Sequence, residues 1–493
     1  MLASVQRLFR HLVVYGSADA AALVINTFLL PVFTRVLSLQ EYGVLALVLV
    51  LEAFLKVLFR WGLDTSFLRL HYDVKDPDRQ RTLAGTATML LVAADGVLLA
   101  WLWVASPWIA TQLFGTASEA WVLRMLALNM FVSTFHFLPL TQLRIEERSR
   151  TVAAWSMVRS FGTIVARLIF VVGFRWSVLG FMVADLVVSL ILFVGLWPTL
   201  RRMTAWAFSW TAARELLVVG LPRVPHGLLH QVTAMADRFL LGMYLSLEQL
   251  GLYSIAATVA STLKLYPVAL TTAWTPLAFE AMRRPDAPVF YARTATYAFT
   301  VLAALSTALV LVGSPLVRLL TPEPYHPAAA LVPLLVLGVA IQACANFVST
   351  ALQIAKHMVP FPIITLVAAV VSVAANVLLI PVFGTQGAAL ASAIAQLALL
   401  IATWWFAHHS YPIPYERGRL ARITGVAVAV SLAGMLVREM TGQLAADVVN
   451  VLLLAAFPAG LLAVRVFRPT ETASLRAWLR SLLRSAASGS NPG

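Results

Sequence analysis

Apolar runs long enough to cross a lipid bilayer follow one another along almost the whole chain. A membrane-spanning helix needs about 20 mostly apolar residues, and no interval between the runs is long enough for a soluble domain. The sequence therefore predicts an all-α polytopic membrane protein with 14 transmembrane helices. The predicted spans are 11–36, 42–68, 82–105, 120–143, 151–173, 177–198, 217–245, 251–279, 290–313, 328–355, 359–383, 386–408, 420–438 and 447–467.

The composition excludes several classes of protein. Hydrophobic residues make up 60% of the 493 residues and charged residues 12%, against about 45–50% and about 25% in soluble domains. A soluble enzyme, a disordered chain and a nucleic-acid-binding domain are therefore not expected. The apolar stretch 12–34 is too long for a cleaved signal peptide and is expected to remain as the first span. The single cysteine, Cys344, cannot form an intrachain disulfide.

Basic residues alternate between the loops in a way that predicts the orientation. Of the 36 lysines and arginines, 24 lie at the N-terminus, in or beside the loops after even-numbered spans and in the C-terminal tail, while 4 lie beside the other loops and 8 lie inside spans. Cytoplasmic loops carry the excess of Lys and Arg, so both termini are expected to be cytoplasmic. Residues 470–486 are predicted to form an amphipathic helix on the anionic cytoplasmic leaflet.

The chain contains an internal repeat. The segment LSLQEYGVLALVLVLEAFLKVL from Leu37 and the segment LSLEQLGLYSIAATVASTLKLY from Leu245 align without gaps at an offset of 208, and a second similarity joins the openings of spans 6 and 12. Parallel repeats of this kind are typical of transporters, with the substrate site between the halves. The predicted parts are an N-lobe (1–200), a cytoplasmic linker (201–216), a C-lobe (217–409), spans 13 and 14 (410–467) and the tail (468–493).

Charged residues inside the spans indicate where function lies. A charge at the bilayer centre costs about 2.5–3.5 kcal/mol on insertion scales, so each such residue must face water, another charge or a polar ligand. The basic ones are Lys56, Arg60, Arg124, Arg159, Arg167, Arg223, Arg238 and Lys264, and the acidic ones are Asp19, Glu52, Asp64, Asp95, Asp185 and Asp237. In the first half, Arg159 and Arg167 are interpreted as polar supports.

Span 2 carries the most regular set of charges. Glu52, Lys56, Arg60 and Asp64 recur every four residues, which predicts one polar stripe on a helix face. The stripe is either a self-neutralising ladder of ion pairs or the wall of a water-filled cavity, and both descriptions can hold together.

Lys264 in span 8 has no acidic neighbour three or four residues away, and the repeat pairs it with Lys56. Two lysines facing each other across a pseudo-twofold axis would repel unless an anion lay between them, which predicts a negatively charged substrate. A salt bridge from Lys264 to an acid on another helix remains the alternative.

Span 7 combines prolines with polar side chains. Pro222 and Pro225 weaken the helix near its cytoplasmic end and favour a hinge. His226 and His230 share one face, but no third ligand lies nearby in the sequence, so these histidines and Arg223 are predicted to line the cavity and no metal site is expected.

Asp237, Asn376 and Ser392 form a candidate oxygen-ligand site for a coupling cation, either Na⁺ or H⁺. The alternative is that Asp237 pairs with Arg238 or another buried base.

Three stretches carry a family resemblance. FLLPVFTRVLSLQEYGVLAL (28–47), DRFLLGMYLSLEQLGLYSIAATVA (237–260) and NVLLIPVFGTQGAALASAIA (376–395) resemble the polysaccharide (O-antigen-type) flippase branch of the multidrug/oligosaccharidyl-lipid/polysaccharide exporter superfamily, as does RIEERSRTVAAWSMVR (144–159). The resemblance implies two six-helix lobes around a central cationic cavity. It also implies alternating access and transfer of polyprenyl-diphosphate-linked oligosaccharide to the outer leaflet of the bacterial cytoplasmic membrane, by a protein expected to act as a monomer.

Related lipid II flippases carry more basic residues in the first span, whereas here that span holds Asp19 and Asn26, with Arg35 only at its end. Relatives that bind sodium between spans 7, 11 and 12 match Asp237 and Asn376, but Ile380 stands where a second acid would be expected.

The sequence-based hypothesis places Lys56 and Lys264 at the central phosphate contacts, with Arg60 and Arg223 nearer the cytoplasmic entrance. Three other functions remain open: a cation-coupled multidrug exporter of the same superfamily, a lipid II flippase, and a membrane enzyme acting on lipid-linked sugars. The excess of basic over acidic residues within the spans disfavours the exporter, and the outer loops near 105–119 and 314–327 lack the paired carboxylates that would favour the enzyme.

Overall fold

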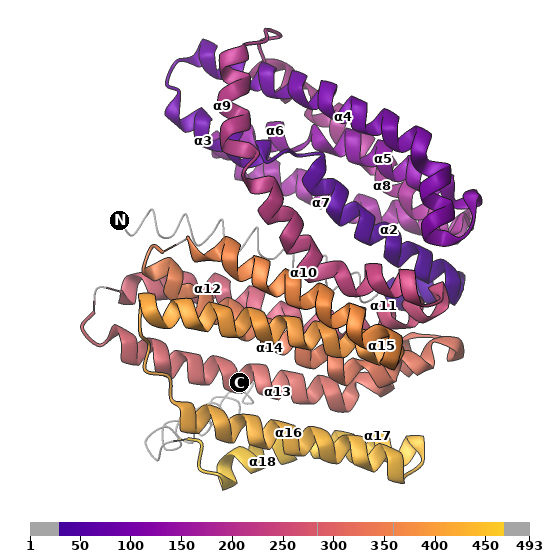
Figure 1. The fold of residues 1–493 in the computed structure, drawn as a ribbon, viewed down its shortest axis with the longest axis vertical. Coiled ribbons are helices and arrows are strands. Elements are labelled where there is room, and N and C mark those ends of the chain that lie inside the picture. The colour runs from indigo at the N-terminus through magenta and orange to yellow at the C-terminus, as the bar shows by residue number, and fades with distance from the viewer. Residues whose placement is uncertain (1–28, 283, 358, 468–493) are drawn as a thin grey trace, which may run out of the picture. The chain divides into compact units, whose positions relative to one another are not determined.

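The computed structural model describes residues 29–282, 284–357 and 359–467, and these residues form an all-helical fold without strands (Figure 1). Ten of the described helices are long and apolar enough to cross a membrane. The prediction of an all-α polytopic membrane protein is therefore confirmed, while the count of 14 spans stays a prediction. Most of the predicted first span and the predicted amphipathic tail lie outside the described residues.

The described helices form two compact units. The first unit comprises residues up to 277 and 316–411, and the second comprises 278–315 and the residues from 412 onward. The helices centred in the first unit are α2 (Leu39–Leu58), α3 (Leu63–Asp73), α4 (Pro77–Phe114), α5 (Ala120–Thr134), α6 (Phe137–Ile145), α7 (Ser149–Arg167), α8 (Ser177–Met203), α9 (Trp210–Gly220), α10 (Arg223–Tyr244), α11 (Leu247–Ser261), α12 (Leu265–Ala281), α14 (Val332–Ile354) and α15 (Pro360–Ser410). Those centred in the second are α13 (Ala287–Leu320), α16 (Arg417–Met440), α17 (Gln443–Leu453) and α18 (Ala456–Ala463).

Several predicted spans are broken helices. The interval 42–68 is formed by α2 and α3, the interval 217–245 by α9 and α10, and the interval 251–279 by α11 and α12. The intervals 359–383 and 386–408 both lie in α15, which bends at Gly384. The φ of Gly384 is 58° and its ψ is −134°, a conformation that glycine adopts without a Cβ clash.

The repeat is visible in how α2 and α11 begin. Ser38 caps α2 by accepting a hydrogen bond from the Glu41 amide, and the Glu41 carboxylate accepts one from the Ser38 amide. Ser246 caps α11 in the same way by accepting from the Gln249 amide. Each cap satisfies amide groups that a helix N-terminus leaves without partners. The two serines are separated by the repeat offset, so the local structure follows the aligned sequence.

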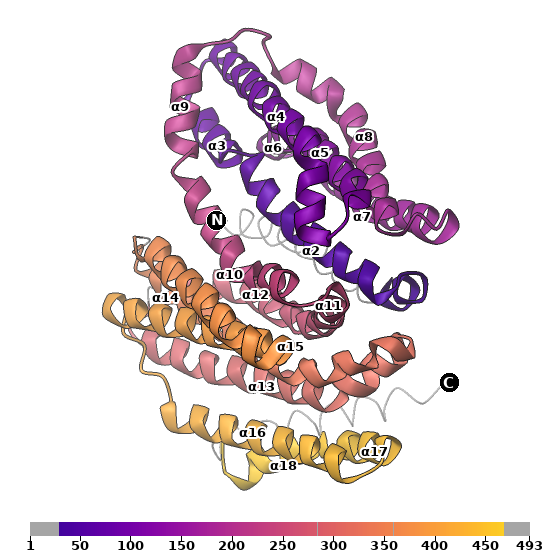
Figure 2. The ribbon, with the colours of Figure 1, turned by 45° about the vertical axis from the view of Figure 1, so that its right-hand side comes forward.

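The core of the N-lobe lies between α3, α4, α5 and α8. In Figures 1 and 2 the helices α4, α5 and α8 run side by side, and each pair of them packs together. The buried cluster contains large apolar side chains from α3, α4, α6, α8, α9 and the turn after α5, among them Phe67, Leu83, Leu91, Phe135 and Leu200. This apolar packing holds the polar faces of α2, α5 and α8 in place on its border.

Two helix breaks meet within the first unit. Trp61 and Gly62, between α2 and α3, have φ values of 51° and 69°, and a Cβ on Gly62 would overlap the carbonyl oxygen of Gly220 at the end of α9. The chain turns at Leu221 and Pro222 before α10 begins. The proline-containing turn predicted in span 7 therefore lies directly against the break in span 2.

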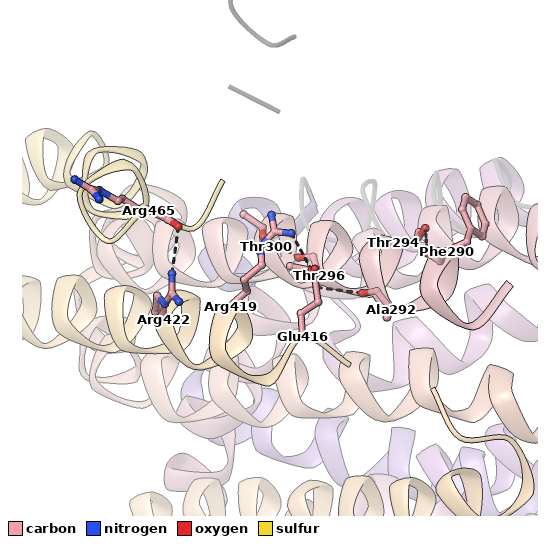
Figure 3. A network of polar contacts seen from close by, with 9 residues as sticks. All are labelled: Phe290, Ala292, Thr294, Thr296, Thr300, Glu416, Arg419, Arg422 and Arg465. Carbon is pink, nitrogen blue, oxygen red and sulfur yellow. Dashed lines mark hydrogen bonds and ion pairs between the residues drawn. The ribbon is translucent and has the colours of Figure 1, made fainter. Parts of the chain in front are cut away.

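The second unit is held together by a polar network (Figure 3). The Glu416 carboxylate accepts hydrogen bonds from the Thr296 hydroxyl of α13 at 2.8 Å and from the Arg419 guanidinium at 2.9 Å. Arg419 also lies over the ring of Tyr297, 5.7 Å from its centroid. Arg422 donates to the carbonyl oxygen of Arg465 at 3.2 Å, just beyond the end of α18. The start of α16 is thereby linked to α13 and α18.

Candidate functional site

A cavity of about 530 Å³ opens inside the N-lobe. Its wall is formed by α2, α3, α5, α6, α7 and α8, and it carries five basic side chains against three acidic ones. The polar lining includes Glu52, Lys56, Arg60, Asp64, Asn129, Ser133, His136, Arg144, Arg159, Thr163, Arg167, Asp185 and Ser189.

The predicted stripe of span 2 reaches this cavity on a broken helix. Glu52 and Lys56 lie on α2, Arg60 lies in the turn that follows it, and Asp64 lies on α3. The prediction of one continuous helix face was wrong, because the left-handed residues Trp61 and Gly62 interrupt the helix. The break nevertheless keeps all four side chains on the cavity wall. The outer pair of the predicted ladder forms, with 3.7 Å between the Arg60 Nη1 and the Asp64 Oδ2.

Asp185 of α8 neutralises one of the basic residues. The Arg167 guanidinium donates two hydrogen bonds to the Asp185 carboxylate, at 2.9 and 2.8 Å, and lies 5.3 Å from the Phe181 ring centroid. The two side chains are only 19% and 12% exposed. This bidentate pair supports the interpretation of Arg167 as a structural residue. Its acidic partner, on a different helix, could not be read from spacing along one helix.

The charge of Arg159 of α7 acts on several ionisable groups of the cavity. The sequence-based interpretation had given Arg159 only the role of a polar support. Its charge acts on Glu52, Lys56 and Arg60, and also on His136. Arg167 is paired to Asp185 and Arg60 lies near Asp64, and the cavity wall also carries Lys56 and Arg159 beside the carboxylate of Glu52. Its basic residues thus outnumber its acidic ones in a space that can admit a polar ligand.

We predict that the Arg167–Asp185 pair supports the cavity wall. Removing one partner of a buried ion pair leaves the other charge uncompensated and costs about 3–5 kcal/mol, so Asp185→Ala should lower the thermal unfolding midpoint in detergent clearly. The control is Asp73→Ala, because Asp73 lies 4.0 Å from Arg69 in an exposed pair, which contributes little. Equal midpoints for the two variants would contradict this role of Asp185.

A second, smaller cavity of about 110 Å³ lies in the C-lobe. Lys264 ends the short helical turn between α11 and α12 and lines this cavity together with Asp237 and Arg238 of α10. Lys56 and Lys264 therefore line two different cavities in this conformation, and Lys264 has an acid from another helix nearby. The remaining polar lining comes from Ser261, Gln342, Ser392 and Gln396.

The predicted coupling-cation residues are only partly brought together. Asp237 and Ser392 share the C-lobe cavity, whereas Asn376 is fully buried and donates to the Ser372 carbonyl oxygen at 2.8 Å. One Asp237 oxygen accepts from the Tyr253 hydroxyl and the other from the Arg238 amide. Because both carboxylate oxygens are engaged and two basic groups share the cavity, the arrangement fits a bound cation poorly. The cation site stays a prediction.

The polar residues predicted on span 7 lie on one exposed part of α10. Arg223, His226 and His230 are all exposed, and none of them lines the two cavities described above. Among the described residues there is no group of three or more His, Cys, Asp or Glu side chains that could hold a metal ion.

Comparison with known proteins places the chain. A family model described as "Polysaccharide biosynthesis protein" matches residues 32–282, and one described as MatE matches residues 222–378. The chain is 26% identical over 234 residues to the succinoglycan biosynthesis transport protein ExoT of Rhizobium meliloti (strain 1021). That match covers 47% of this chain and 45% of the relative, so the chain spans less than half of that protein.

Solved transporters share the fold. The inward closed lipid II flippase MurJ has a TM-score of 0.71 at 13% identity, over 92% of this chain and all of that one. An inward-facing multidrug resistance MATE transporter has a TM-score of 0.58 at 16% identity, over 82% and 93% of the two chains. A transporter from Pyrococcus furiosus, described as having a binding pocket of reverse polarity, has a TM-score of 0.55 at 14% identity, over 82% and 94%.

At these identities the solved structures establish the fold alone, but the first family model covers just over half of the 493 residues. The chain is therefore a multi-pass membrane protein that belongs to the polysaccharide biosynthesis protein family, within the multidrug/oligosaccharidyl-lipid/polysaccharide exporter superfamily.

Proposed function

We propose that this transporter flips polyprenyl-diphosphate-linked oligosaccharide from the cytoplasmic to the outer leaflet by alternating access, for cell-surface polysaccharide biosynthesis. The observation that carries the proposal is the N-lobe cavity, where basic residues outnumber acidic ones within the membrane-spanning helices. A diphosphate cannot cross hydrocarbon without compensation, because burying an isolated ion costs tens of kcal/mol by idealised solvation. Fixed positive charges lower that cost.

The cavity offers separate surfaces for the two polar parts of such a substrate. Lys56 and Arg159 are the proposed diphosphate contacts, with Arg60 beside them. Arg144, in the last turn of α6, is the fourth basic contact. The hydroxyl and amide groups of Asn129, Ser133, Thr163 and Ser189 supply hydrogen-bond partners for sugars. Lys264 and Arg223 are proposed to contact the substrate in other stages of the cycle, because neither lines this cavity.

The remaining proposals concern the membrane orientation of the protein, its oligomeric state and a coupling ion. The distribution of basic residues supports cytoplasmic termini in a bacterial cytoplasmic membrane. The substrate is released chemically unchanged, by a protein acting as a monomer. A coupling ion remains a proposal, and no transport step is assigned to the Asp237 region.

Movement of a fluorescent polyprenyl diphosphate oligosaccharide in proteoliposomes tests the proposal. The full-length protein is reconstituted, and label in the outer leaflet is destroyed by a membrane-impermeant reductant. We expect a larger reducible fraction than in protein-free vesicles, with the lipid-linked sugar recovered intact.

Two further probes are measured in the same assay. Lipid II tests for a lipid II flippase, and an organic cation tests for a drug exporter. Transport of the cation alone would replace the flippase assignment by a drug exporter. Covalent conversion of the sugar would indicate an enzyme.

A further inference from the structure

Asp95, in the middle of α4, is the most completely enclosed acid in the part of the chain that the structure describes. Its residue is 0% exposed, and neither carboxyl oxygen accepts a hydrogen bond of ordinary geometry. Its polar neighbours are the Trp61 indole and the Thr134 hydroxyl, and the Thr134 hydroxyl already donates to the Met130 carbonyl oxygen. The substrate cavity does not include Asp95, so the proposed function gives this residue no role.

Among the residues that the structure describes, no charged group compensates Asp95. The helices packed against α4 are α3, α5, α8 and α9, together with the short turn Ala117–Glu119, and none of their charged side chains acts on Asp95. Most of these charged groups interact with other residues. The ion pairs and hydrogen bonds are Asp64 with Arg60, Arg69 with Asp73, Arg124 with Ser106, Asp185 with Arg167, Arg202 with Glu146 and Glu215 with Arg79. His71 contacts the Phe67 ring, Glu119 is repelled by Glu41, and Arg201 and Arg214 are exposed.

Because the Asp95 carboxyl group is enclosed without a charged partner, its neutral form is favoured over its ionised form. An ionised carboxylate in such surroundings would cost tens of kcal/mol by idealised solvation, whereas the neutral acid costs only a few. Enclosure of this kind therefore favours the protonated form of Asp95 in this conformation. The proton can leave only if water or a cationic partner reaches the carboxyl group, which requires the surrounding packing to open.

Trp61, a polar neighbour of Asp95, belongs to the break between α2 and α3. Its φ of 51° is unusual for a bulky residue, and its indole Nε1 is buried without a hydrogen-bond partner. Trp61 and Gly62 form the break between α2 and α3, and Gly62 touches Gly220 at the end of α9, beside the α9–α10 turn. Strained backbone of this kind persists where the surrounding structure holds it in place. Asp95 thus lies beside one helix break that contacts another.

We propose that Asp95 is a proton-binding site whose protonation sets the angle of the break between α2 and α3. The protonated acid fits the closed packing around Trp61. Loss of the proton leaves a carboxylate that must gain water, so the α2–α3 break changes. Through the Gly62–Gly220 contact, that change reaches the span 7 turn. The proposal does not depend on which substrate the transporter carries.

The test measures protonation and helix geometry without a transported substrate. Spin labels at Leu49→Cys on α2 and Tyr72→Cys on α3, in a Cys344→Ser background of the full-length protein, report the distance across the break. We expect the distance distribution to shift between acidic and alkaline pH, and Asp95→Asn to keep the acidic distribution at all pH values. Asp78→Asn, an exposed acid on the same helix, should leave the shift unchanged.

Infrared spectroscopy gives a second readout. The carbonyl band of a protonated carboxylic acid should be present at acidic pH, absent from Asp95→Asn and displaced in Asp95→Glu. A label distance that does not respond to pH, or an Asp95→Asn variant that responds as the unsubstituted protein does, would overturn the coupling. Absence of any carboxylic acid band that depends on Asp95 would overturn the proton site itself, even if Asp95→Asn folded poorly. Neither outcome bears on the flippase proposal.

Discussion

Replacing Lys56 and Arg159 together by alanine should slow movement of the lipid-linked oligosaccharide in proteoliposomes by at least about 100-fold. Each lost hydrogen bond to a charged group costs about 1.5–3 kcal/mol, which corresponds to about 10- to 150-fold in affinity. The two side chains approach the cavity from different helices, α2 and α7. Removing Lys56 and Arg159 ends their mutual repulsion but also deprives Glu52 of two compensating charges, so folding and membrane insertion of the variant are measured beside transport.

The controls separate charge from position. Lys56→Arg and Arg159→Lys keep the positive charge and should retain most of the transport. Arg69→Ala and Lys75→Ala remove exposed basic residues of the same lobe that do not line the cavity, and they should have little effect. Lys264→Ala reports on the C-lobe cavity separately. Normal flipping by a well-folded Lys56→Ala, Arg159→Ala double variant would remove the diphosphate contacts from the proposal.

The part of the site that could be predicted is the part that depends on the spacing of residues along one helix. Charges every four residues on span 2 predicted that Glu52 and Lys56 share a polar surface, and both line the N-lobe cavity. The match between the segments from Leu37 and Leu245 predicted an internal repeat, and both segments begin with a serine-capped helix. The first signal depends on residues four positions apart, and the second on two segments that align without gaps.

The missed features depend on contacts between distant segments or on unusual backbone. Asp185 meets Arg167 across two helices, so no spacing within one helix could reveal the pair. The left-handed conformation of Trp61 has no sequence signal, because tryptophan seldom adopts it. The sequence-based interpretation of Arg159 was that of a polar support within the first half of the chain. Only the fold shows that the charge of Arg159 acts on Glu52, Lys56 and Arg60.

Gly43→Ala and Gly251→Ala are each expected to destabilise the transporter, by about 1–3 kcal/mol or more. The two glycines occupy equivalent positions in the repeat, and their contacts are reciprocal. A Cβ at Gly43 would overlap the carbonyl oxygen of Leu247, and a Cβ at Gly251 would overlap that of Leu39. These are backbone atoms, so α2 and α11 must separate to accommodate either methyl group. Small residues permit such close approach between membrane helices.

Because the two glycine contacts are reciprocal, the Gly43→Ala, Gly251→Ala double variant gives a further prediction. Once the first methyl group has separated α2 from α11, the second has more room, so the combined loss of stability should be smaller than the sum of the two single losses. Gly96→Ala is the matched control, because a Cβ there meets no atom within 4 Å. That variant should gain about 0.5–1 kcal/mol from helix propensity. Unfolding midpoints in detergent measure all four proteins. If Gly43→Ala were as stable as Gly96→Ala, the crossing of α2 and α11 would not be as close as the repeat requires.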